Sequence, residues 1–92
     1  MLEWYRCTGN TWCELDRLDL DHPAVRNTTG VYVLWIGEDN DRKIIRVGQG
    51  KIYDEIIKLQ NEIVIKAFSS NGFKISWVET YHISYHVHVL VL

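Results

Sequence analysis

The amino-acid sequence predicts an α+β fold, in which a small mixed or antiparallel β-sheet carries one main helix on one face. Two β-rich runs, residues 30–37 and 43–48, flank the short polar stretch "EDND", which is typical of an antiparallel hairpin. Directly after the hairpin the apolar residues recur every three to four positions, which indicates a helix. A third β-rich run, "FKISWVETY" at residues 73–81, supplies a further strand.

The hairpin leads into the predicted helix without a linker. Its first strand, "GVYVLWIG", is apolar on both faces, as expected of a strand that is covered on two sides. The helix presents one apolar face, at spacings of four, three and four residues, formed by Ile52, Ile56, Leu59 and Ile63. We expect it to end between Asn61 and "SSNG" at residues 69–72, and the β-branched run in "EIVIKAF" fits either a helix or a strand.

The two ends of the chain carry different signals. The first 29 residues are the least regular, with a short strand or loop, one helical turn and a turn, because Pro23 and "RNTTG" interrupt any helix. From residue 82 polar and apolar residues alternate strictly, which predicts a C-terminal strand. No charge blunts this strand, so we expect it to pair within the sheet or with a second subunit. Its apolar face comprises Ile83, Tyr85, Val87, Val89 and Val91.

Composition limits the classes of function. The 92 residues suit a single domain, and a hydrophobic content of 47% with four Trp and five Tyr excludes a disordered chain. A net charge of −2 argues against tight nucleic-acid binding, because phosphate neutralisation supplies most of that affinity. A small local basic patch is compatible with the sequence, because five basic residues fall close together: Arg42, Lys43, Arg46, Lys51 and Lys58.

The cysteine count bears on the cellular compartment. Cys7 and Cys13 are too few for the disulfide framework of a small secreted domain, so we expect both thiols to be free and buried as small hydrophobes. The N-terminus has no apolar signal-peptide segment, and no apolar run reaches the length of a transmembrane helix. The sequence therefore predicts a cytoplasmic protein with no membrane partner.

The hairpin also carries a pair of motifs. Gly30-Val31-Tyr32, a short polar loop, Val47-Gly48 and a helix directly after them resemble the GIY-YIG nuclease superfamily. "TGVYVLWIG" and "IIRVGQGKI" are similar to small GIY-YIG-like proteins whose second motif reads Val-Gly-Gln-Gly. The resemblance covers residues 28–60 and, loosely, residues 73–79. It implies a fold derived from metal-dependent endonucleases, with DNA or RNA as a possible partner.

The resemblance implies a role for each matching residue. Tyr32 would be the base-side residue that activates water, and Arg46 or Lys58 would hold the phosphate. Glu79 would bind Mg²⁺ or Mn²⁺, a cofactor that is needed only if the domain is active. Further binding residues, at the strand ends and in the "GQG" stretch before the helix, would be Gly30, Gly48, Gln49, Gly50 and Lys51.

Three positions depart from the family pattern. Arg46 replaces the second-motif Tyr and cannot act as a base. The helix Arg would fall at Glu55 or Ile56, and a carboxylate there would repel a phosphate. The metal-binding Glu belongs on a later helix, where this chain has a strand pattern without a carboxylate. These departures predict a catalytically degenerate domain with weak nucleic-acid binding, its last helix lost or replaced by a strand.

An alternative function comes from the C-terminal strand. A non-enzymatic structural or assembly module could form a homodimer by pairing this strand between two subunits. The two functions differ in what they require. Nuclease ancestry needs an open cleft at Tyr32 and Arg46, whereas assembly buries residues 83–91.

Possible metal sites are weak. His86 and His88 are neighbours on one face of the C-terminal strand, but the spacing of four ligands that marks a zinc site is absent. Cys7, Cys13 and His22 lack a recognised metal-ligand spacing. Half-exposed imidazoles and small buried thiols account for these residues.

Two further groups of residues are predicted to have structural rather than catalytic or binding roles. The acidic cluster of Asp16, Asp19 and Asp21 predicts a solvated loop. Trp35 and Trp77 are predicted to pack against the helix, and stacking on nucleic-acid bases is the alternative.

Overall fold

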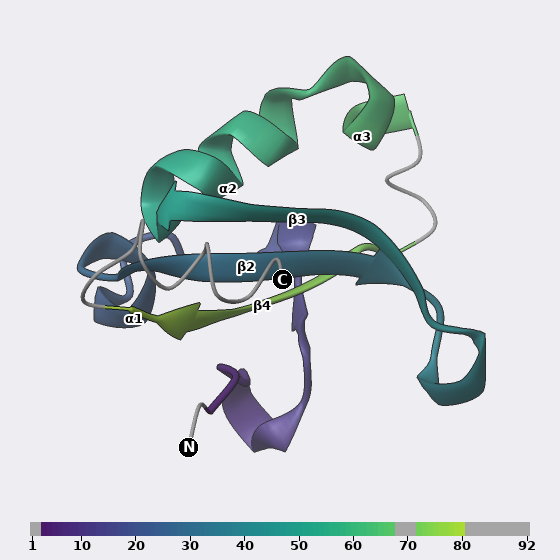
Figure 1. Ribbon diagram of the computed structural model, residues 1–92, viewed down its shortest axis with the longest axis horizontal. Helices are drawn as coiled ribbons and strands as arrows, with labels where there is room; N and C mark the ends of the chain where they lie inside the picture. Colours follow the sequence, from purple (N-terminus) through teal and green to yellow (C-terminus); the bar gives the residue numbers. More distant parts are fainter. Residues whose placement is uncertain (1–2, 68–71, 81–92) are drawn as a thin grey trace.

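One antiparallel sheet organises the fold, with the strand order β1-β4-β2-β3 (Figure 1). The computed structural model describes residues 3–67 and 72–80, and the predicted α+β class is confirmed within them. The strands are β1 (Cys13–Glu14), β2 (Thr29–Ile36), β3 (Lys43–Lys51) and β4 (Lys74–Glu79). β2 is thus an interior strand, and β3 lies at one edge of this four-stranded arrangement.

Helices cover one face of the sheet. They are α1 (Pro23–Arg26), α2 (Ile52–Asn61) and α3 (Ile63–Ala67), and α2 runs alongside β3 with α3 beyond its end (Figure 1). Single 3₁₀ turns span Thr8–Asn10, Leu15–Arg17 and Asp39–Asp41. The core lies between this helical layer and the sheet, where the side chains with at most 1% exposure include Leu15, Leu34, Ile52, Ile56, Leu59 and Ile75.

β2 and β3 form the predicted antiparallel hairpin. Thr29 pairs with Lys51 at one end and Ile36 with Lys43 at the other. The register shifts between Leu34 and Trp35, which leaves Ile45 as the extra residue of a β-bulge. Side chains alternate about this register, so even-numbered residues of β2 face the helices and odd-numbered residues face the opposite side.

The "GQG" stretch is not the loop that the sequence suggests. Gly48, Gln49 and Gly50 belong to β3, which continues to Lys51 and enters α2 at once. The reason is the register, because Gly30 at the start of β2 pairs with Gly50 and holds it in the ladder. Successive N–H groups of an extended strand point to opposite sides, so they do not converge on one phosphate as those of a Gly-rich loop before a helix would.

The main helix is shorter than its apolar spacing suggests. α2 ends at Asn61, at the near limit of the predicted range, because Glu62 has an extended backbone with φ −71° and ψ 130°. Within this run, "IVIKA" forms the separate helix α3 (Ile63–Ala67). This break changes the helical phase, so Ile63 is 83% exposed and was wrongly assigned to the buried face, whereas Ile65 is 3% exposed.

Pro23 begins a helix rather than ending one. It occupies the first turn of α1, where its missing N–H costs nothing, and the His22 side chain caps the turn by accepting from the Ala24 N–H. Upstream, the N-terminal segment lies along β4, since the Tyr5 N–H donates to the Trp77 carbonyl at 2.9 Å. The sequence predicts a short strand or loop and one helical turn for this region, and over residues 3–29 the structure has the short strand β1 with three short helical elements.

The prediction of two free thiols is wrong. Cys7 and Cys13 form a disulfide, with a Cα–Cα distance of 5.2 Å. The intervening loop turns back on itself, and the Cys7 N–H donates to the Thr11 carbonyl at 2.8 Å. The six-residue separation of the two cysteines does not by itself indicate that the chain turns back between them. The sequence therefore offers no reason to pair them. The disulfide ties the N-terminal segment to β1.

Removing the disulfide is expected to lower the free energy of unfolding by about 2 kcal/mol, because a closed loop of this length restricts the unfolded chain. Urea denaturation of the wild type with and without dithiothreitol measures the loss. The Cys7→Ser/Cys13→Ser variant is the control, and its unfolding midpoint should not respond to dithiothreitol. A wild-type midpoint that is equally insensitive would show that the bond does not contribute.

Some expectations lie outside the part of the chain that the structure describes. These are the C-terminal strand with its apolar face and the histidines at positions 82, 86 and 88. Among residues 3–67 and 72–80, no helix is long and apolar enough to cross a membrane.

Candidate functional site

Tyr32, the base-side residue implied by the resemblance, lies in the middle of β2 with its ring packed across β3. Only 4% of the residue is exposed. The ring covers Gly48, and a Cβ at residue 48 would lie 2.6 Å from both the Cε2 and the hydroxyl oxygen of Tyr32. Glycine at position 48 therefore makes room for the Tyr32 ring.

The first-motif glycine, Gly30, approaches the other neighbour of β2. A Cβ at residue 30 would lie 1.9 Å from the carbonyl oxygen of Val78 in β4. Gly50 has a φ of 139°, which side-chain-bearing residues rarely adopt. Packing and backbone conformation thus account for the glycines that were predicted to bind phosphate.

Arg46 extends from β3 towards the end of α2 and is engaged by a carboxylate. Its Nη1 donates to Oε2 of Glu62 at 2.7 Å, and the two side chains are 39% and 40% exposed. This hydrogen bond is the main reason that the pKa of Arg46 is raised. The Glu62 carboxylate offsets the charge of Arg46 and occupies one of its N–H donors, which weakens any hold on a phosphate.

The first turns of α2 carry a second carboxylate. Glu55 accepts from Nζ of Lys58 at 3.2 Å, and its side chain is only 17% exposed. It packs against Gly50, whose Cβ position lies 3.2 Å from the Glu55 Oε2. Glu55 is also where the family would place its phosphate-binding Arg, so negative charge occupies the expected phosphate site.

Tyr32 is surrounded by these groups, and together they disfavour its ionised form. Burial is the largest cause of its raised pKa, followed by the negative charge of Glu55; Arg46 acts in the opposite sense, and Glu62 adds a smaller increase. A general base needs a pKa near the working pH. The raised pKa keeps Tyr32 protonated at neutral pH, so it is poorly suited to abstract a proton from water.

The raised pKa of Tyr32 predicts a loss of stability at alkaline pH. Because the folded protein favours the neutral phenol, its contribution is complete below the unfolded value of about 10 and declines as the pH rises through the folded pKa. Urea denaturation between pH 8 and pH 11.5 measures this decline. Tyr32→Phe should show a flatter dependence, and identical slopes for the two proteins would contradict the assignment.

The remaining predicted residues do not join this cluster. Gln49 and Lys51 are exposed on β3. Glu79, the predicted metal ligand, ends β4, which borders β2 on the side opposite β3, and it lines a separate hollow with Ala24 and Trp77. Within the described ranges, no group of three or more His, Cys, Asp or Glu residues is placed to hold a metal ion.

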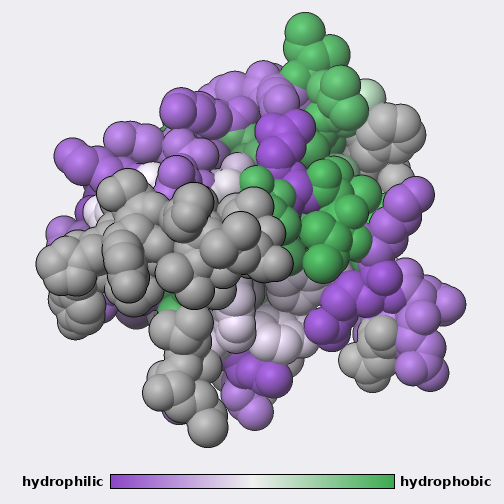
Figure 2. Space-filling view, in the orientation of Figure 1, coloured by the Kyte–Doolittle hydropathy of each residue, from purple (hydrophilic) through white to green (hydrophobic). Residues whose placement is uncertain are grey.

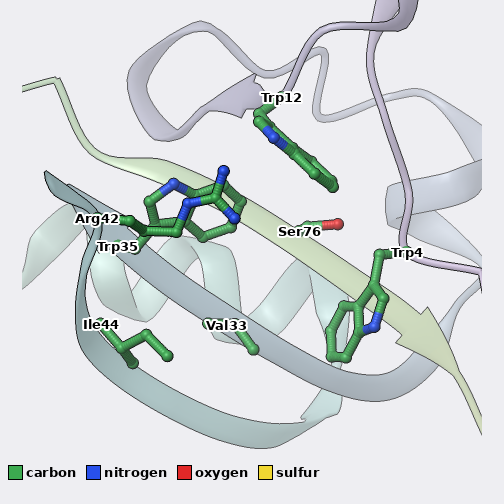
Figure 3. Close-up of a pocket in the computed structure, with 7 residues that line it drawn as sticks. All are labelled: Trp4, Trp12, Val33, Trp35, Arg42, Ile44 and Ser76. Atoms are coloured by element: carbon green, nitrogen blue, oxygen red, sulfur yellow. The ribbon is translucent and has the colours of Figure 1, made fainter. Parts of the chain in front are cut away.

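A different group of side chains gathers on the sheet face opposite α2. A hollow of about 190 Å³ opens there, and Figure 3 shows its lining residues around one space, from β2, β3, β4, the turn before β3 and the N-terminal segment. The lining comprises Trp4, Trp12, Val33, Trp35, Arg42, Ile44 and Ser76. Trp35 therefore does not pack against α2 as predicted, because its odd-numbered position in β2 turns it to this side.

Two of the aromatic rings of the hollow, Trp12 and Trp35, contact each other and lie near arginine side chains. Trp12 meets Trp35 edge to face, with ring centroids 5.3 Å apart. The Arg6 guanidinium lies 3.9 Å from the Trp12 centroid, and that of Arg42 lies 5.1 Å from the Trp35 centroid. Trp77 remains on the helical face, where its indole N–H donates to the Ala24 carbonyl and its ring stacks on Tyr5.

Sequence reasoning missed several contributors to these two groups, among them Glu62, Trp4 and Trp12. The signal for Glu62 is a lone acid before the apolar run "IVI". The signal for the tryptophans is their number, since an irregular N-terminal segment has little reason to carry two large aromatic residues unless they pack or bind. The chain matches no protein-family model, no curated protein and no solved structure.

Proposed function

We propose that this chain is a GIY-YIG nuclease-like domain that has lost catalysis and retains weak nucleic-acid binding. Support for the nuclease-like part comes from the hairpin motifs, the packing of Tyr32 on Gly48 and the helix that follows β3 directly. The loss of catalysis rests on one observation above all, the 2.7 Å ion pair between Arg46 and Glu62.

The charges around Tyr32 explain why hydrolysis would fail. Phosphoryl transfer needs positive groups aimed at the oxygens on which charge develops. Here Arg46 and Lys58 are each bound to a glutamate, and the side chain of Glu55 takes the place of a phosphate-binding Arg. A phosphate entering this site would meet two carboxylates, which repel it. Mg²⁺ or Mn²⁺ would be a cofactor of this domain only if it still hydrolyses phosphodiester bonds.

We place the protein in the cytoplasm, on the basis of its sequence. The Cys7–Cys13 disulfide counts against a cytoplasmic location, because the cytosolic thiol pool keeps most such bonds reduced. Alkylation of free thiols at the moment of cell lysis distinguishes a reduced pair from an oxidised one. A fully oxidised pair throughout growth would contradict the cytoplasmic assignment.

The proposal predicts binding without cleavage. Plasmid and single-stranded DNA incubated with Mg²⁺ or Mn²⁺ should remain intact with both the wild type and Tyr32→Phe. The same preparations should bind DNA with a dissociation constant of about 10⁻⁶ to 10⁻⁴ M at physiological salt, as nonspecific binders do. Metal-dependent cleavage that disappears in Tyr32→Phe would contradict the degenerate site, and undetectable binding even at low salt would contradict the nucleic-acid function.

The sequence assigns the assembly alternative to the C-terminal strand, which lies outside the described residues, and a different strand edge now favours such assembly. β3 is an edge strand among the residues described, and its Ile44 and Val47 side chains are 60% and 58% exposed. Figure 2 shows apolar side chains gathered over this strand. Exposed apolar edges commonly pair with a second chain. Light scattering should then give a dimer mass that Val47→Lys reduces to that of a monomer, whereas a strictly monomeric wild type would contradict this alternative.

A further inference from the structure

We propose that the hollow between Trp4, Trp12 and Trp35 binds an unpaired base of a single-stranded nucleic acid. The inference rests on the proposed function for the class of ligand, but it assigns the contact to the sheet face opposite α2. That face is separated by the sheet from the Tyr32 cluster, so the two surfaces can be tested independently.

The aromatic rings provide the stacking surface. Trp4 is 37% exposed and Trp12 is partly buried, and Figure 3 shows their indole rings on two sides of the opening above Val33 and Ser76. Trp35, at 4% exposure, supports Trp12 from its edge and is not itself available for stacking. Every nucleobase has a π-face that such rings accept without regard to sequence.

The size of the hollow selects its occupant. About 190 Å³ is smaller than the range of about 300–1,000 Å³ that holds drug-sized ligands and whole cofactors. A single planar ring system fits a space of this size. Bases in a duplex are stacked and paired, so only an unpaired strand can place one here. The hollow is therefore expected to favour single strands over duplexes.

Two arginines supply positive charge at the rim. Arg6 lies over Trp12, and Arg42 lies between Trp12 and Trp35 at 5.8 Å and 5.1 Å from their centroids. Their positive charge at the rim favours the phosphates that flank an inserted base. Glu38 and Lys74 border a smaller adjoining hollow, so the local field is mixed. Stacking should therefore contribute more of the affinity than charge does.

The site is formed before a ligand arrives. The N-terminal segment that carries Trp4 and Trp12 is held by the disulfide, by the Tyr5–Trp77 backbone hydrogen bond and by the Ser76 hydroxyl, which donates to the Tyr5 carbonyl at 2.6 Å. Prior ordering of this kind reduces the entropy lost on binding.

Fluorescence anisotropy with a labelled oligo(dT) and a labelled duplex tests the proposal. The single strand should bind more tightly than the duplex, with a log K against log salt slope of only about −1.4, as expected for two phosphate contacts. Trp4→Ala and Trp12→Ala should each weaken single-strand binding about five- to hundredfold. Ile63→Ala, which removes an 83%-exposed side chain on α3, is the matched control and should bind as the wild type does.

The other possible outcomes distinguish failure of the aromatic site from failure of the proposed nucleic-acid function. Tighter binding to the duplex, or binding that Lys58→Ala weakens and the tryptophan variants do not, refutes the aromatic site but leaves the proposed function intact. Failure to bind either DNA refutes both. Thermal melts establish that each variant is folded, and Trp4→Ala decides the matter if Trp12→Ala unfolds, because Trp4 lies outside the core.

Discussion

Gly30→Ala is expected to destabilise the protein by about 3 kcal/mol or more, which would lower the melting temperature by roughly 12 °C or more. The added Cβ would lie 1.9 Å from the Val78 carbonyl oxygen and 3.1 Å from the Glu79 Cα. Both atoms belong to the backbone of β4, so no side chain can rotate away to relieve the overlap. The interior pairing between β2 and β4 must open instead. Differential scanning calorimetry measures the change.

Gly9→Ala is the matched control. Gly9 has a φ of 77°, so a methyl group there is unfavourable for the backbone, but nothing lies within 4 Å of the new Cβ. The cost should be about 1–2 kcal/mol, the strain of the left-handed conformation alone. Equal losses at the two positions would mean that the β2–β4 approach is looser than the structure shows.

The parts of the fold that local patterns specify are predictable from the sequence. The β-rich runs and the polar turn between them define the hairpin, and the spacing of Ile52, Ile56 and Leu59 defines the buried face of α2. Each of these signals is contained within about ten residues. The α+β class follows because they occur in the order strand, strand, helix, strand.

The features that depend on distant contacts were not predictable. Ile63 continues the apolar spacing of α2, and the helix nevertheless breaks at Glu62, which is bound by Arg46 from sixteen residues away. The disulfide likewise depends on a loop that folds back, and no spacing rule for two cysteines anticipates it. The spacing of apolar residues does not encode the Arg46–Glu62 ion pair, and the spacing of two cysteines does not encode the loop that joins them.

The candidate site also has a part that the sequence predicted and a part that it did not. The resemblance implied that Tyr32 and Arg46 lie close together, and the register of β2 and β3 places both on the helical face. It also implied that Glu79 completes the site, but Glu79 lies beyond β2 on β4. The sequence did not predict where the aromatic hollow lies, because Trp4 and Trp12 come from an irregular segment whose path no periodic pattern indicates.

Substitutions at Tyr32 and Gly48 test whether the packing of one residue on the other is enough to explain why both occur in the hairpin. A Cβ on Gly48 would lie 2.6 Å from Cε2 and 2.7 Å from Cζ of the Tyr32 ring. Gly48→Ala should therefore cost about 2 kcal/mol in the wild type, since the crowded ring must leave its preferred rotamer. Tyr32→Phe keeps both carbon atoms and loses only the hydroxyl, so the cost should persist in that background.

Tyr32→Val should abolish most of this penalty. Without the ring, Gly48→Ala meets open space, and its cost should fall to about 0.5 kcal/mol or less, which gives a coupling energy near 1.5 kcal/mol in a double-mutant cycle measured by urea denaturation. An unchanged cost in the Tyr32→Val background would show that Gly48 is needed for another reason. Coupling through the ring alone means that packing is enough to maintain a tyrosine in one motif and a glycine in the other. A chain that has lost hydrolysis would then still carry both, because the hairpin needs them to fold.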